Sequence, residues 1–178
     1  MNRISDAFRQ AFRRHPSGVA ILTARGKSGP VALTISSLIS VSARPPLVAF
    51  SLSAASNSAA EFLEADTMVI HFPRFADQAL AVLCATPGSD RFAPGVAWES
   101  MPTGEPRYRD VETWFRAKVR DRLPVDGATI VTAELLDGRA DTVEADALVY
   151  LDRNWHSLSA DEDMPRPVPE KASARTEA

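Results

Sequence analysis

Residues 32–46 read "ALTISSLISVSARPP", and this stretch decides the fold. Apolar, partly β-branched residues alternate with small polar ones, which predicts one long strand or two short ones. It carries five hydroxyl side chains, namely Thr34, Ser36, Ser37, Ser40 and Ser42. Hydroxyls at that density are unfavourable in a core unless polar partners lie against them. We therefore expect a polar group, from the protein or from a ligand, to lie beside these strands.

The rest of the chain predicts more strands. Apolar runs recur about every ten residues, a spacing typical of a barrel or sandwich. The expected strands cover residues 18–24, 31–43, 45–53, 67–72, 113–123, 127–137 and 147–158. The strands follow one another as neighbours, so the fold class is mainly β: a closed β-barrel with inserted helices.

Three segments predict the inserted helices. The first has apolar residues at helical spacing, Ala7, Phe8, Ala11 and Phe12, with arginines on its other face. The second and third cover residues 57–66 and 76–86. Residues 87–110 are rich in proline and glycine, so we expect a long irregular loop there, of the kind that often carries function.

Length and composition bound the class of protein. A chain of 178 residues predicts one domain, residues 1–160, followed by a charged, Pro/Ala-rich tail, residues 161–178, that we expect to be disordered. The net charge of −3 does not favour a nucleic-acid or anionic-membrane partner. No apolar run approaches the roughly 20 residues of a membrane span, and no signal peptide is recognisable. With Cys84 as the single cysteine, a cytoplasmic location is expected.

Motifs for protein-borne catalysis are missing. His15, His71 and His156 lie far apart in sequence, and no metal-binding pattern accompanies them, so we expect no metal site. There is no G-x-S-x-G elbow and no phosphate-binding glycine loop. Cys84 falls on the apolar face of an expected helix and is predicted to be inert. We therefore assign no catalytic side chain, and an enzyme built from this chain needs a cofactor to carry the reaction.

Four quoted pieces of sequence resemble one known family in order and spacing. They are "FRRHPSGVAILTA" (12–24), "LTISSLISVSARPPLVAFSL" (33–52), "ADQALAVLCA" (76–85) and "SDRFAPGVAWE" (89–99). Together they resemble the flavin reductase-like family, whose fold is the FMN-binding split β-barrel of Greek-key type. The resemblance covers roughly residues 5 to 158.

The resemblance implies an activity and partners. It implies an NAD(P)H:flavin oxidoreductase that binds FMN, with FAD as the alternative, and transfers hydride from NADH or NADPH to the flavin. Members of the family supply reduced flavin to two-component monooxygenases and are usually homodimers. A monooxygenase component and a second copy of the chain are therefore the expected partners.

The resemblance also implies positions for a flavin site. The flavin ring and ribityl chain are expected against Thr34, Ile35, Ser36, Ser37 and Leu38, with Ser51 and Ser53 on the next strand. The phosphate is expected at the start of the second helix, where free N–H groups favour an anion, on Ser56, Asn57 and Ser58. Three further candidates can be explained without a flavin. His71 is either a flavin contact or a core histidine. Arg91 and Phe92 are flavin contacts, dimer-interface residues or packing residues.

Two departures from the family pattern keep alternatives open. The sequence "DGAT" (126–129) has Ala128 where many members have a histidine near the nicotinamide, so Ala128 and His156 are the candidates for that pocket. Ala55 stands where many members have a basic residue, and Arg25, Lys27, Arg74 or Arg91 could replace it. The alternatives to a reductase are a flavin-binding protein without efficient NAD(P)H turnover and an apo split barrel that acts as an interaction module.

Overall fold

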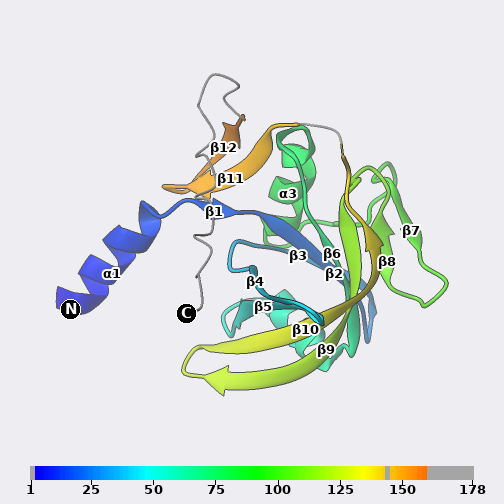
Figure 1. The fold of residues 1–178 in the computed structure, drawn as a ribbon, viewed down its shortest axis with the longest axis horizontal. Coiled ribbons are helices and arrows are strands. Elements are labelled where there is room, and N and C mark those ends of the chain that lie inside the picture. The colour runs from blue at the N-terminus through cyan, green and yellow to red at the C-terminus, as the bar shows by residue number, and fades with distance from the viewer. Residues whose placement is uncertain (1–2, 143–144, 160–178) are drawn as a thin grey trace, which may run out of the picture.

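The computed structural model describes residues 3–142 and 145–159 of the chain (Figure 1). The expected domain, residues 1–160, falls almost wholly within these ranges. The expected disordered tail, residues 161–178, lies outside the described residues.

Seven antiparallel strands form the main sheet, which curls around a core (Figure 1). Their order across the sheet is β3-β2-β6-β9-β10-β5-β4. The bounds are β2 (Ala20–Gly26), β3 (Gly29–Ile35), β4 (Ile39–Ala43), β5 (Pro46–Ser53), β6 (Thr67–His71), β9 (Trp114–Val125) and β10 (Ala128–Arg139). The mainly β prediction is confirmed.

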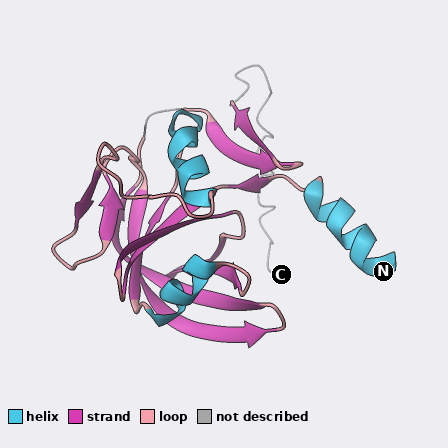
Figure 2. Cartoon of the chain, turned by 180° about the vertical axis from the view of Figure 1, so that it is seen from behind, coloured by secondary structure: helices cyan, strands magenta, loops and turns pink. Residues whose placement is uncertain are grey.

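Two apolar clusters hold the elements together. The first fills the curled sheet with side chains such as Leu22, Phe50 and Met68, and helix α2 (Asn57–Glu64) adds Phe62 to it. The second lies between β2 and helix α3 (Gln78–Ala85) and includes Tyr108. A short 3-10 turn (Phe75–Asp77) precedes α3. Figure 2, from behind, shows the helices inserted around the sheet, as the sequence predicts.

Two smaller sheets flank the main one. Strands β1 (Ser17–Gly18), β11 (Ala147–Leu151) and β12 (Asn154–Leu158) form the first, in the order β1-β11-β12. Strands β7 (Trp98–Ser100) and β8 (Pro106–Tyr108) form the second. The antiparallel pairing of β1 with β11 joins the segment that follows α1 to the β11–β12 hairpin.

Three sequence expectations need correction or choice. Residues 31–43 form two strands, because the chain turns at Ser36–Leu38. Residues 147–158 are not one strand but a hairpin, whose turn lies at Asp152 and Arg153. The loop 87–110 contains the β7–β8 pair, which its many prolines and glycines concealed.

Helix α1 (Arg3–Arg13) confirms the amphipathic prediction but buries none of its residues. Its apolar face carries Ile4, Phe8 and Phe12, whose exposed fractions are 68%, 57% and 62%. Figures 1 and 2 show the helix projecting from the body of the molecule. No helix of the described residues is both long and apolar enough for a membrane span.

Candidate flavin site

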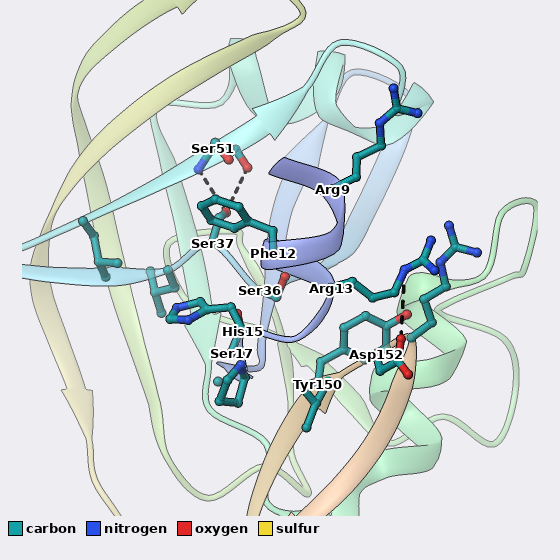
Figure 3. A pocket seen from close by; sticks show the side chains of 16 residues that line it. Arg9, Phe12, Arg13, His15, Ser17, Ser36, Ser37, Ser51, Tyr150 and Asp152 are labelled. Atoms are coloured by element: carbon teal, nitrogen blue, oxygen red, sulfur yellow. Dashed lines mark hydrogen bonds and ion pairs between the residues drawn. The ribbon is translucent and has the colours of Figure 1, made fainter. Parts of the chain in front are cut away.

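A cavity of about 720 Å³ opens where the end of α1, the β3–β4 connection, β5 and the β11–β12 turn meet (Figure 3). The hydroxyls of Ser36, Ser37 and Ser51 lie along one side of it, and Arg9 and Arg13 lie on another. The remaining lining residues are Phe12, His15, Pro16, Ser17, Gly18, Leu38, Ile39, Tyr150, Leu151, Asp152 and Arg153. The cavity therefore joins neutral hydroxyls to cationic groups.

The two neighbouring serines of the β3–β4 connection have different surroundings. The Ser37 Oγ donates to the Ser51 carbonyl at 3.1 Å and accepts from the Ser51 N–H at 3.0 Å. The Ser37 side chain thus links the β3–β4 connection to β5 at a point where β4 and β5 have no ladder pair. Ser36 is exposed and makes no hydrogen bond within residues 3–142 and 145–159. Its hydroxyl is therefore open to a ligand in the cavity.

A smaller cavity of about 200 Å³ lies next to the first and shares Ser36 and Tyr150 with it. Thr34 and Ile35 line this second space together with Trp155. The Thr34 hydroxyl already donates to the Ala81 carbonyl at 2.7 Å, so it anchors α3 rather than standing free. The rings of Tyr150 and Trp155, which meet edge-on 4.9 Å apart, form the aromatic part of its wall.

The expected phosphate site lies at the start of α2, outside the lining of both cavities. Ser56 is the N-cap residue, yet its side chain makes no capping bond, and Asn57 begins the helix. The first turn carries no acidic residue, so the helix dipole has no anion beside it. Ser53 accepts a bond from the Ala55 N–H at 3.3 Å. This helix start has the polar groups that an anion needs.

Arg91 supplies the cation at this helix start. Its guanidinium donates to the Ser58 hydroxyl at 2.7 Å and to the carbonyls of Ala32 and Thr86. The other candidates are engaged elsewhere or lie apart: Arg74 pairs with Asp141 at 3.0 Å, and Lys27 pairs with Glu64 at the far end of α2. Of the four candidates, Arg91 is thus the one bonded to a residue of this helix start, and its role in place of a basic residue at Ala55 stays a prediction.

Phe92, the next residue, lies in the second apolar cluster. Its ring stacks on Tyr108 at 5.5 Å and meets Trp98 edge-on at 5.1 Å. It lines neither of the two cavities described above. Of its three alternatives, the structure supports packing.

His71 is completely buried at the end of β6 and lines neither of these cavities. The Tyr108 N–H donates to its Nε2 at 3.0 Å, so Nδ1 carries the proton and donates to the Ile21 carbonyl at 3.1 Å. Burial disfavours the charged imidazole and lowers the pKa of His71 to about 4. Both ring nitrogens are used inside the protein, so the structure contradicts flavin contact and supports the core alternative.

The two residues proposed for the nicotinamide pocket lie apart. Ala128 pairs with Ser53 of β5, close to the loop before α2, and does not line the cavities. His156 is exposed, and its Nε2 lies 3.2 Å from the Leu151 carbonyl. Successive strand residues point to opposite sides, so the neighbour Trp155 faces the small cavity and His156 faces away. His156 thus lines neither of the two cavities, and its place in a nicotinamide pocket stays a prediction.

Sequence reasoning missed the cationic side of the large cavity. Arg9 and Arg13 are four residues apart on α1 and therefore lie on the same side of the helix. Arg153 joins them from the β11–β12 turn. The spacing of the two helix arginines was a usable signal, but the approach of Arg153 depends on a hairpin that was expected to be a single strand.

Comparison with known proteins places this geometry in a family. The family model for the flavin reductase like domain matches residues 12–159. An NADH:FMN oxidoreductase of Rhodococcus erythropolis is 39% identical over 124 residues, 70% of this chain and 65% of that protein. The match thus spans less than two-thirds of that relative's length.

Solved structures agree in fold over nearly the whole chain. A flavin reductase domain protein from Arthrobacter sp. FB24 is 28% identical and superposes with a TM-score of 0.82, covering 90% of this chain and 99% of that one. BorF, the flavin reductase component of a bacterial two-component tryptophan halogenase, is 25% identical with a TM-score of 0.76, covering 88% and 99%. The chain belongs to the flavin reductase-like family.

Proposed function

We propose that this protein is an NADH- or NADPH-dependent flavin reductase that binds FMN and passes hydride from the nicotinamide to the flavin. The observation that carries the proposal is the open hydroxyl of Ser36 beside Ser37 and Ser51, in a chain whose relative is an NADH:FMN oxidoreductase. FAD is the alternative flavin.

The residues present fit a flavin. A cavity of about 720 Å³ lies within the range of roughly 300–1,000 Å³ that small-molecule sites occupy. Serine hydroxyls can donate to flavin nitrogen and oxygen atoms without bringing a charge into the wall. The free N–H groups at the start of α2, with Arg91 at Ser58, suit a phosphate. Ring and phosphate would thus be held by different parts of the chain.

The protein's own contribution is orientation and exclusion of water. A bound flavin supplies the hydride acceptor, so no side chain needs to transfer a proton in that step. Ser36 and Ser51 would fix the ring, while Leu38, Ile39 and Phe12 cover it from water. This agrees with the missing catalytic motifs in the sequence.

Ala128 favours a second candidate function. The methyl group of Ala128, beside Ser53, can neither donate nor accept a hydrogen bond, so a nicotinamide finds no partner there. A flavin-binding protein of the same fold without efficient NAD(P)H turnover is therefore the alternative. An apo split barrel acting as an interaction module is the least supported, because the open Ser36 would then have no ligand.

We also propose a homodimer and a monooxygenase or halogenase-type partner that receives reduced flavin. The apolar face of α1 and the exposed Ile39 and Val41 of β4 form the kind of patch that marks an interface. Phe12 also lines the cavity, so a second copy on α1 would help to close it. The nicotinamide supply favours the cytoplasm. Sedimentation equilibrium tests the dimer, and a monomer at micromolar concentration would contradict it.

The visible spectrum tests the function. The protein is mixed with FMN, freed of unbound flavin, and then treated with NADH or NADPH without oxygen. Retained flavin whose absorbance is lost on adding nicotinamide supports the reductase. Retained flavin that stays oxidised supports the second candidate, and failure to retain FMN or FAD contradicts both.

A further inference from the structure

The turn between β11 and β12 has an unusual backbone for its sequence. Leu151 pairs with Asn154, so Asp152 and Arg153 form a two-residue hairpin loop. Their φ angles are +48° and +64°, and these are the only non-glycine residues with positive φ in the described chain. Hairpin loops of this kind prefer Asn-Gly or Asp-Gly, because glycine adopts the second position without strain. Arginine at this position is therefore unfavourable for folding.

The same turn is held against helix α1. The Asp152 N–H donates to the Arg13 carbonyl at 2.8 Å, and the Asp152 carboxylate lies 4.0 Å from the Arg13 guanidinium (Figure 3). Arg153 follows directly and lines the large cavity with no ion pair to any residue in 3–142 or 145–159. The turn thus delivers an unpaired guanidinium to the cavity beside Arg13.

The charge of this region differs from that of the chain. The cavity lining contains three arginines, Arg9, Arg13 and Arg153, against one aspartate, whereas the whole chain has a net charge of −3. Arg9 is partly engaged, since its Nε donates to the Ser5 carbonyl at 3.2 Å. Strain at a ligand-facing residue is often retained for function, and guanidinium groups match phosphate oxygens in geometry.

We propose that Arg153, together with Arg13, binds the diphosphate of the reduced nicotinamide dinucleotide at this side of the cavity. The proposal rests on the proposed reductase function. The flavin phosphate has its own cation in Arg91, at the start of α2, so these arginines are left for the second nucleotide. Arg153 is a specificity-determining residue that acts by binding, not by transferring a proton.

The test compares wild type with Arg153→Gly in steady-state oxidation of NADH with FMN present. The variant should raise KM for NADH about tenfold and change kcat less than twofold. Because glycine relieves the left-handed strain, Tm should not fall and should rise by up to about 3 °C. A merely structural arginine would move stability without moving KM, so a KM within twofold of wild type would overturn the proposal.

Three comparisons locate the contact. Reduced nicotinamide mononucleotide, which lacks the diphosphate, should give the same KM in both proteins. The KM for NADPH should rise in Arg153→Gly by the same factor as the KM for NADH. A rise confined to NADPH would assign Arg153 to the 2′-phosphate and overturn the diphosphate assignment. The dissociation constants of FMN and FAD should stay within twofold, and a change in FAD alone would move the contact to the flavin and overturn the proposal.

A matched control and a binding measurement complete the design. Arg14→Gln removes an exposed arginine of the same segment that does not line the cavity, and its KM should equal that of wild type. If wild type retains FMN but oxidises no NADH, the proposed reductase function is contradicted. Calorimetric titration of wild type and Arg153→Gly with NAD⁺ then tests the inference separately. Binding weakened about tenfold in Arg153→Gly would support the contact; equal or undetectable binding in both proteins would overturn it.

Discussion

The protein has two polar regions that look alike in sequence and differ in the structure. Around β6, β8 and β9, the buried His71 and Glu105 are bonded to neighbouring side chains or to the backbone. At the cavity, Ser36 and Arg153 are left open. The difference teaches that a hydroxyl without a partner or a charge without a counter-charge, not polarity itself, marks a residue that can hold a ligand. Arg91, which is bonded only to neutral groups, keeps such a charge.

Glu105 illustrates the paired region. It is 2% exposed, and its carboxylate accepts bonds from Arg116 at 2.9 Å and from the Thr103 hydroxyl. Burial alone would raise the pKa of Glu105, but the bonds from Arg116, Thr103 and Thr67 outweigh it and lower the pKa to about 2. A carboxylate so satisfied has little capacity left for a ligand.

The largest expected effect comes from removing a paired core group. His71→Leu removes the ring's bond to the Ile21 carbonyl and leaves the buried Tyr108 N–H without its His71 partner, which should lower the free energy of unfolding by about 3 kcal/mol. The FMN dissociation constant of the folded variant should stay within twofold, because His71 lines neither of the two cavities. Urea unfolding and fluorescence titration measure the two. Weaker FMN binding with unchanged stability would return His71 to the flavin site.

The second effect is a pH dependence. The pKa of His71 is about 4 in the folded protein against 6.5 ordinarily, so the unfolded chain binds a proton first as pH falls. Above pH 6.5, His71 should not lower the free energy of unfolding. Between pH 6.5 and 4.5, its protonation in the unfolded chain should lower that free energy by about 2 kcal/mol. Urea unfolding across this window measures it. In His71→Gln this part of the slope should vanish, and an unchanged slope would contradict the assignment.

A smaller effect separates the two neighbouring serines. Ser37→Ala removes two hydrogen bonds to the backbone of Ser51 and should cost about 1 kcal/mol of stability. The β3–β4 connection should loosen with it, which faster amide hydrogen exchange at Ser51 would reveal. Exchange at Ser51 as slow as in wild type would mean that the ladder, not Ser37, holds this point.

Much of the fold could be predicted because its signals are local. The expected strands at residues 113–123 and 127–137 and the expected helix at residues 57–66 depend on near neighbours, and β9, β10 and α2 confirm them. The β11–β12 hairpin could not be predicted, since Asp152-Arg153 is not a typical turn sequence. The β7–β8 pair was missed because prolines and glycines usually interrupt strands.

The candidate site was predicted in part. The hydroxyl run indicated a polar group beside Ser36 and Ser37, the family resemblance added Ser51, and the three serines line one cavity. Whether His71 is paired depends on Tyr108, 37 residues away, and no local pattern carries that information. The same holds for Arg91 and Ser58, which meet only after α2 and the long loop pack on β3.

The most direct test of the account compares an open serine with a paired one. Ser36→Ala should weaken FMN binding about fivefold, with the urea midpoint unchanged, because its hydroxyl holds nothing in the protein. Ser89→Ala is the matched control: its hydroxyl donates to the Leu83 and Thr86 carbonyls, so it should lower the midpoint and leave FMN affinity alone. Equal FMN affinity in wild type and Ser36→Ala would contradict the claim that the open hydroxyl marks the flavin site.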